Sequence, residues 1–306
     1  MNTELFVKKN RIGSIAYQWL SKNQQAEVFG TTSGGIFIHL LTGYQTIYLT
    51  NYPDFGPINI NLVNPIPKQW EKGKKLEIRF DEGMLFFQNG LNELSFSEFK
   101  IWQNQPSLPL TITAEEFLIR VKKTSQQLFL IKGDHGFTSL LPKVYSDGAS
   151  EVESSLTQVW QQIQGLKKSL FQKDIHSFLS NAKNLISYGR GLTPSGDDFL
   201  CGLIYCLRRK DRFLQYQQFL DLIQPEIIRM ASEQTTSIST SLLYGCFLGE
   251  AHSRIENMTD ALTNSESAFT NQALRMAGWG SSSGADTTLG IVIACQVLLN
   301  LSEGTK

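Results

Sequence analysis

Two short segments near the C-terminal end of the chain, 199–207 and 289–297, are apolar almost all the way round a helix. A helix without a polar face is normally buried on every side, so the two segments predict a pair of helices at the centre of a helical domain. Each segment contains a glycine, Gly202 in the first and Gly290 in the second. Because glycine inside a helix costs about 1 kcal/mol relative to alanine, we expect the two backbones to approach closely and cross there.

The same pattern, S-G-x-D-x-x-x-G, leads into both segments, starting at Ser195 and at Ser283. A glycine-rich loop precedes each copy, at 189–194 and at 278–282. Each serine and the aspartate three residues later fit a capping box, and such a cap contributes about 1 kcal/mol. Capping and close packing explain part of the repeat. They do not explain the glycines and the arginine of the first loop, or the additional aspartate, Asp197, that follows it.

The chemistry of these loops predicts a small-molecule site. Glycines ahead of a helix let backbone N–H groups converge on a ligand, and the helix dipole favours an anion there. The Arg190 guanidinium can donate two hydrogen bonds to a carboxylate or phosphate. Asp197 and Asp198 would repel a bare anion unless they turn away, bind a cation or accept from substrate N–H groups, so a carbamoyl or amide substrate suits the mixture.

We expect two sets of site residues, and a third segment is open to two interpretations. The hydroxyl run 235–241 is either the capped start of a helix or a further part of the site. The expected substrate-binding residues are Gly189, Arg190, Gly191, Gly196, Ser237, Ser239, Ser282, Ser283, Gly284 and Asp286. The expected catalytic residues are Thr193, Ser195, Asp197 and Asp198.

The first half of the chain has a different character. Runs of β-branched and aromatic residues between turn residues, and one alternating hairpin, predict strands. A capping box at Thr113 opens a helix over 114–125, and the run 128–131 is typical of a last strand. The predicted strands are 26–29, 35–41, 45–50, 76–80 and 84–88.

Helical periodicity takes over after the turn at 145–148. The sequence therefore predicts an α+β protein with a β-rich, barrel-like domain over 1–147 and an all-helical domain over 148–306.

Composition excludes several classes of protein. Lysine plus arginine and aspartate plus glutamate both number 28, so the net charge is zero and the basic excess of a nucleic-acid binder is absent. No apolar run of about 18 residues occurs, so no membrane span is expected, and we identify no signal peptide. The four cysteines lie in apolar stretches, which favours buried thiols and a cytoplasmic protein. The histidines lack metal-site spacing, so we expect no cofactor.

The stretch 189–202 resembles the hallmark G-x-G-L-T-P-S-G-D-D-F-L-x-G of the AllH-like subunit family of bacterial oxamate carbamoyltransferase. Ser237-x-Ser239 and 280–286 look like further blocks of that family, and the segment around Trp102 is similar in layout. The resemblance implies a subunit of an enzyme that converts oxalurate and phosphate to oxamate and carbamoyl phosphate in allantoin degradation. Its implied ligands are phosphate, carbamoyl phosphate and oxamate, and its implied partners are other carbamoyltransferase subunits. The resemblance does not assign catalytic residues.

Two alternatives stay open at this stage, and so does assembly into a homo-oligomer. Asp197, Asp198 and Asp286 could share Mg²⁺ in a metal-dependent hydrolase or transferase, because hard cations prefer oxygen ligands. The chain could also be a non-catalytic scaffold in a multi-subunit enzyme, in which case the repeated turn is a folding device.

Overall fold

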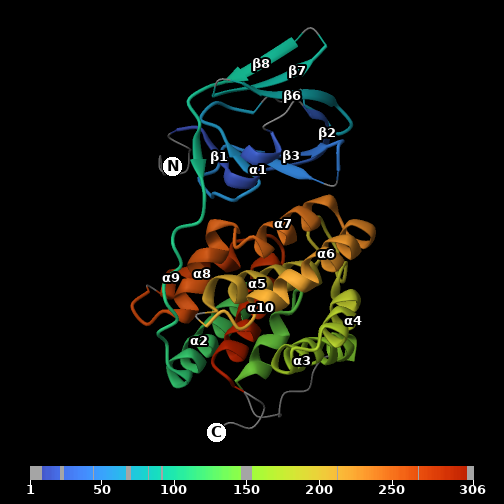
Figure 1. Cartoon of the computed structure of the whole chain (residues 1–306). Coiled ribbons are helices and arrows are strands. Elements are labelled where there is room, and N and C mark those ends of the chain that lie inside the picture. Colours follow the sequence, from blue (N-terminus) through green and yellow to red (C-terminus); the bar gives the residue numbers. More distant parts are fainter. Residues whose placement is uncertain are drawn as a thin grey trace. The chain divides into compact units, whose positions relative to one another are not determined.

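The computed structural model describes residues 9–20, 24–43, 45–66, 70–81, 83–90, 92–145, 154–211, 213–267 and 269–301. Contacts divide the chain into two compact units, whose elements are labelled in Figure 1. Unit 1 comprises Met1–Gln105, Thr240–Gly245 and Glu250–Ser253, and unit 2 comprises Pro106–Ser239, Cys246–Gly249 and Arg254–Lys306. The predicted α+β class is confirmed, because unit 1 is built on a sheet and unit 2 on helices.

The described strands of unit 1 form one curled, nine-stranded sheet, a half-barrel, in the order β8-β7-β6-β2-β3-β4-β5-β1-β9. The alternation of β6 has the expected effect, since Leu76 and Ile78 are buried while Glu77 between them is exposed. Such alternating residues join one hydrophobic core. The elements are β1 (Arg11–Gly13), α1 (Ser14–Trp19), β2 (Gln24–Thr32), β3 (Gly35–Leu40), β4 (Thr46–Thr50), β5 (Asn59–Asn61), β6 (Lys75–Asp81), β7 (Met84–Asn89), β8 (Asn92–Phe96) and β9 (Lys100–Trp102).

The five predicted strands are confirmed as parts of β2, β3, β4, β6 and β7. The antiparallel pairing of β6 with β7 confirms the predicted hairpin, although Glu82 in its turn lies outside the described residues. Sequence analysis missed β1, β5, β8 and β9 because runs of three to five residues carry too little periodicity.

The strand predicted at 128–131 is wrong, because these residues end helix α2, Ala114–Lys132. Thr113 caps the helix as predicted, its side-chain oxygen accepting from the Glu116 N–H at 3.2 Å. The helix continues through the apolar run, where Leu130 is 82% exposed, and ends at Gly133. Packing of α2 against α9 and the following 3-10 helix thus outweighs the local β propensity of the run.

Unit 2 is helical. The boundary between the two units lies earlier in the chain than the change in composition that set the predicted boundary. Because α2 packs on helices of unit 2, the division falls after Gln105, whereas the predicted boundary at 147 lies outside the described residues. The further elements are η1 (Thr138–Val144), η2 (Ser154–Leu156), α3 (Thr157–Gln172), α4 (Ile175–Leu185), α5 (Ser195–Lys210), α6 (Gln217–Gln234), α7 (Ser237–Phe247), α8 (Ser253–Thr263), α9 (Thr270–Ala277) and α10 (Ser283–Leu298).

Helices α5 and α10 form the centre of unit 2, as predicted, and both are buried along almost their whole length. A Cβ atom on Gly202 would lie 2.1 Å from the carbonyl oxygen of Thr287. One on Gly290 would lie 2.0 Å from the carbonyl oxygen of Phe199. The two backbones therefore touch where each helix lacks a side chain, which confirms the predicted crossing.

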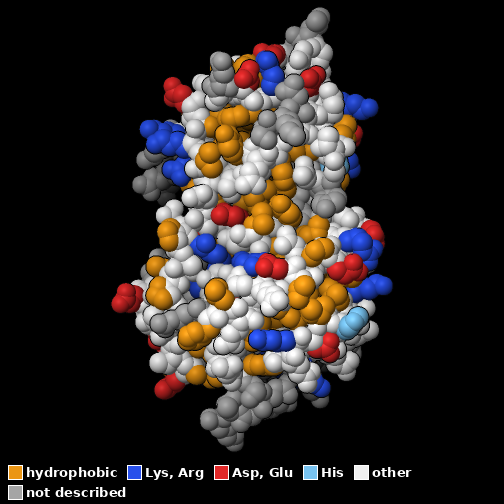
Figure 2. All heavy atoms as spheres, in the orientation of Figure 1, with side chains coloured by type: hydrophobic (Ala, Val, Ile, Leu, Met, Phe, Trp, Pro, Cys, Tyr) orange, Lys and Arg blue, Asp and Glu red, His pale blue; other side chains and the backbone are white. Residues whose placement is uncertain are grey.

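Further features bear on the class of protein. All four cysteines are buried free thiols, and Cys206 and Cys295 face each other across α5 and α10 with their sulfur atoms 3.7 Å apart. Within the described ranges, no helix is both long and apolar enough to span a bilayer. Acidic and basic side chains are interspersed on the face shown in Figure 2, in keeping with the net charge of zero.

Gly202→Ala and Gly290→Ala should each lower the free energy of unfolding by about 3 kcal/mol or more, because the added methyl group meets backbone of the facing helix. Urea unfolding monitored by circular dichroism measures the change. Gly278→Ala is the matched control in the same unit, since its added Cβ would have its nearest neighbour at 3.6 Å, an ordinary contact. Equal stabilities of Gly202→Ala and the control would contradict the close crossing.

Candidate functional site

The two glycine-rich turns ahead of α5 and α10, which we call the facing turns (189–198 and 278–286), lie against each other in unit 2. The Thr193 and Ser283 hydroxyl oxygens are 3.1 Å apart. The Ser195 and Ser282 hydroxyl oxygens are 3.5 Å apart. The crossing of the two helices thus brings together segments about ninety residues apart, as the repeat predicted.

The capping boxes predicted for these turns are wrong. Helix α5 begins at Ser195 with Pro194 in the cap position, and α10 begins at Ser283 with Ser282 in the cap position. Neither cap residue makes a side-chain cap hydrogen bond. Because Ser195 and Ser283 are each the first helical residue rather than the cap, their hydroxyls reach the opposite turn instead of their own backbone.

Asp198 and Asp286, which we call the acid pair, lie beneath these hydroxyls and are 2% and 0% exposed. Burial, and then the charge of Asp286, raise the pKa of Asp198 well above its ordinary value. Burial raises the pKa of Asp286 from 3.8 to about 7. Hydrogen bonds from Ser283 and Thr193 to Asp198, and from Ser282 and Ser195 to Asp286, act in the opposite direction. Each carboxylate is therefore contacted by hydroxyls of both turns.

A loop that sequence analysis missed holds Asp286. The Phe137 N–H donates to Asp286 Oδ1 at 2.7 Å, and the Lys132 Nζ donates to the carbonyl oxygen of Gly280 at 2.6 Å. A Cβ on Gly136 would lie 2.4 Å from Asp286 Oδ1, so this position, with φ of +60°, needs glycine. The two glycines at 133 and 136 were the available signal, but nothing in the sequence links them to Asp286.

Asp197 has different partners from Asp198. Its Oδ1 accepts from the Ser187 N–H at 2.8 Å, and its Oδ2 accepts from the Thr235 hydroxyl. Burial raises its pKa, and these hydrogen bonds lower it. The carboxylate of Asp197 therefore ties α5 to neighbouring segments, and the catalytic role expected from sequence stays a prediction.

The structure does not bring the three aspartates of the magnesium alternative together as one ligand set, because Asp197 is engaged elsewhere. Among the described residues there is no group of three or more histidine, cysteine, aspartate or glutamate side chains that could hold a metal ion.

The first loop has two glycines in the left-handed region of backbone conformation. Gly189 and Gly191 have φ of +110° and +107°, and a Cβ on Gly189 would lie 2.8 Å from the Ser195 nitrogen. Arg190 between them is exposed and makes no ion pair with any described residue. The guanidinium is thus available to a ligand.

Other expected binding residues have structural reasons to be where they are. A Cβ on Gly196 or Gly284 would lie 1.8 or 1.9 Å from a preceding carbonyl oxygen, so close packing alone requires both glycines. Thr236 caps α7 by accepting from the Ser239 N–H at 3.1 Å, which confirms the capping interpretation of the hydroxyl run. Ser239 lies beside Asp197 and lowers its pKa, whereas Ser237 begins the helix. Contact of these residues with a ligand stays a prediction.

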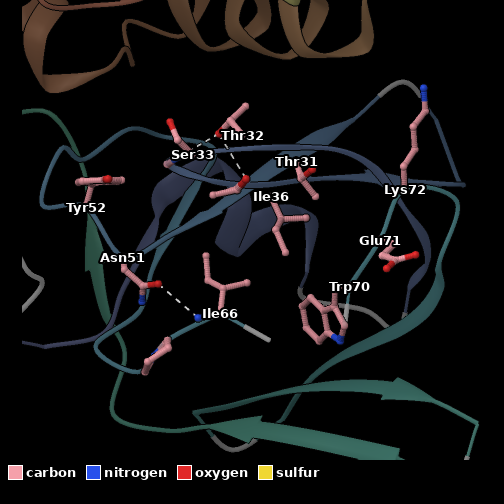
Figure 3. Close-up of a pocket in the computed structure, with 13 residues that line it drawn as sticks. Thr31, Thr32, Ser33, Ile36, Asn51, Tyr52, Ile66, Trp70, Glu71 and Lys72 are labelled. Carbon is pink, nitrogen blue, oxygen red and sulfur yellow. Dashed lines mark hydrogen bonds between the residues drawn. The ribbon is translucent and has the colours of Figure 1, made fainter. Parts of the chain in front are cut away.

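A separate pocket of about 620 Å³ lies in unit 1. The turn between β2 and β3, with Thr31, Thr32 and Ser33, forms one side, and Trp70 forms a wall (Figure 3). Asn51 Oδ1 accepts from the Ile66 N–H at 3.3 Å there, so this polar group is already satisfied. The pocket was not predicted, because its lining comes from loops without a motif.

Comparison with known proteins supports the repeated turn as the distinctive feature. A family model described as oxamate carbamoyltransferase subunit AllH matches residues 185–295. This stretch contains both facing turns, all of α5 and most of α10, and it confirms the resemblance stated from 189–202. Comparisons with curated proteins and with solved structures give no significant match.

Asp286→Asn should make the dependence of stability on pH shallower. A folded-state pKa raised from 3.8 to about 7 means that the folded chain binds a proton more tightly than the unfolded chain. Stability therefore falls as pH rises from about 4 to 7, by about 4 kcal/mol at 1.4 kcal/mol per tenfold change in proton affinity. The asparagine still accepts from Phe137 and carries no charge, so the variant should be more stable than the wild type at about pH 8.

Thermal unfolding between about pH 4 and pH 8 measures this difference. Asp174→Asn is the control, because Asp174 is a half-buried helix cap whose pKa is lowered by hydrogen bonds from Ser177. A wild type and an Asp286→Asn variant with parallel curves would contradict the assignment of a buried, high-pKa carboxyl to Asp286.

Proposed function

We propose that this chain is a subunit of an oxamate carbamoyltransferase and that its facing turns bind the small anionic substrates of the reaction. The observation that carries the proposal is that the facing turns lie inside the stretch that matches the family. The family match spans 185–295, and the two segments that meet in space, 189–198 and 278–286, both lie inside it. Both segments of the proposed site therefore lie in the part of the chain that resembles the family.

The chemistry of the facing turns suits a small oxyanion. The N-termini of α5 and α10 both lie at the junction, and the partial positive charge of a helix N-terminus favours an anion. Arg190 supplies a free guanidinium, and the hydroxyls of Thr193 and Ser283 supply neutral donors. Phosphate, carbamoyl phosphate and oxamate all carry oxyanions of suitable size.

The proposed reaction needs positioning and charge stabilisation more than a protein nucleophile. A phosphate oxygen attacks the carbamoyl carbon of oxalurate, the bond from that carbon to the oxamate nitrogen breaks, and the nitrogen takes the proton that phosphate loses. Arg190 and the loop amides would hold the anion, and Thr193 and Ser195 would orient the carbamoyl group. Work of this kind rests on hydrogen-bond donors fixed in advance by the fold.

A scaffold role is the second candidate, and one observation favours it. Phe129, Leu130 and Ile131 at the end of α2 are 46%, 82% and 53% exposed, which is apolar surface that a partner subunit could cover. Other carbamoyltransferase subunits are partners under both candidates. Full activity of the assembled enzyme with Arg190→Ala would favour the scaffold role.

Arg190→Ala should weaken binding of oxamate and carbamoyl phosphate about tenfold to a hundredfold, because a charge-assisted, two-pronged hydrogen bond is lost. Isothermal titration calorimetry of both ligands, and of phosphate, measures the affinities. Arg229→Ala is the matched control, since Arg229 is an exposed arginine of unit 2 that pairs with Glu226 and Glu233. Equal affinities of the wild type and Arg190→Ala would reject the role given to Arg190.

A further inference from the structure

Four hydroxyl groups of the facing turns contact the acid pair. We call Thr193, Ser195, Ser282 and Ser283 the hydroxyl layer. Ser195 is buried and the other three are half-buried, whereas Arg190 and Ser281 are exposed. A ligand held by the loops would therefore meet the hydroxyl layer before it met a carboxylate.

The direction of each hydroxyl hydrogen decides what this layer presents to a ligand. A hydroxyl has one hydrogen to donate and two lone pairs that accept. When the acid pair is ionised, Ser283 and Thr193 donate to Asp198, and Ser282 and Ser195 donate to Asp286. The hydrogens then point inward, so lone pairs face the loops and two negative charges lie behind them. A layer in that state repels an anion.

The surroundings of the acid pair do not balance two negative charges. Oδ2 of Asp198 and Oδ2 of Asp286 are both buried and have no hydrogen-bond partner among the described residues. Lys132 is the cation that acts on Asp286, but its Nζ donates to the carbonyl oxygen of Gly280. The other titratable groups whose charges act on the pair are Lys132 from α2 and Asp197 from α5, and the charge of Asp198 acts in turn on Cys201 of α5.

One added proton changes both the direction of the hydroxyl hydrogens and the charge of the acid pair. A protonated Asp198 or Asp286 donates its O–H to a partner in the site, and the hydroxyls around it no longer need to donate inward. Their hydrogens can then turn toward the loops and donate to a ligand oxygen. Burial of the pair favours this state, because a single shared charge costs less to bury than two.

We infer that the facing turns bind an oxyanion together with one proton, which the acid pair takes up while the hydroxyl layer turns its hydrogens toward the ligand. This inference rests on the proposed function and names the form in which that site takes its substrate. One proton leaves solvent for each anion bound, and no covalent bond forms or breaks. Asp198 and Asp286 are positioning residues here, because they act on the ligand through the hydroxyl layer.

Calorimetry with oxamate tests the inference on the wild-type chain. Oxamate is a suitable probe because its carboxylate stays ionised throughout the range of about pH 6 to pH 9. Titrations in two buffers with different heats of ionisation give the number of protons taken up on binding. We expect uptake of one proton at the upper end of the range, and an affinity that falls about tenfold per pH unit above the pKa of the acid pair.

Asparagine variants give the second measurement. The amide of Asp198→Asn with Asp286→Asn supplies N–H donors where the proton would sit, so the double variant should bind oxamate without proton uptake. Its affinity at about pH 9 should be at least about tenfold higher than that of the wild type and should not change with pH. Asp174→Asn changes the cap of α4, away from the facing turns, and should behave as the wild type.

The outcomes separate this inference from the proposed function. If the wild type binds oxamate with the same affinity from about pH 6 to pH 9 and takes up no proton, the inference is wrong and the anion site stands. If the wild type binds none of oxamate, phosphate and carbamoyl phosphate at any pH, the proposed function is wrong and the inference falls with it. If Mg²⁺ alone binds to the wild type, releases protons and does not bind to the double variant, the pair is a cation site, which also overturns the inference.

Discussion

Direct contact between the backbones of α5 and α10 is the constraint on which the rest of unit 2 depends. Gly202 and Gly290 leave no room for any side chain at the crossing. The close approach of the two backbones fixes where the first turns of the helices meet. It thereby places the hydroxyls of one turn against the carboxylate of the other. The glycines weaken their own helices by about 1 kcal/mol each. Complete burial of both helices offsets this loss.

The same contact brings two buried carboxyl groups together, so that their negative charges repel each other. Two carboxyl groups are buried together, and each has one oxygen with no hydrogen-bond partner in the part of the chain that the structure describes. Apolar residues of similar size would be more stable there, since replacing buried charged groups by well-packed apolar ones is often neutral or stabilising. A protein that keeps such a pair gives up stability at a defined place, which is the usual sign of a functional site.

Sequence reasoning identified the features that have a local signature. Apolar periodicity identified the buried helices, and a glycine inside each of them indicated the crossing. Two failures at the site have different causes. The capping boxes were wrong because a shift of one residue in the start of a helix sends Ser195 and Ser283 to the opposite turn. The contact of Phe137 with Asp286 was missed because 149 residues separate them and no pattern links the two positions.

The loop between α2 and η1 lies outside the matched stretch 185–295, yet its Phe137 N–H donates a hydrogen bond to Asp286. The matched stretch therefore does not contain all the contacts of Asp286. A fragment cut to that stretch would leave the Asp286 carboxylate without this backbone donor and would lack Gly136, which lies against the same carboxylate. A fragment that keeps this contact must therefore begin no later than α2. The limits of the sequence match and the limits of the structural unit around Asp286 are different.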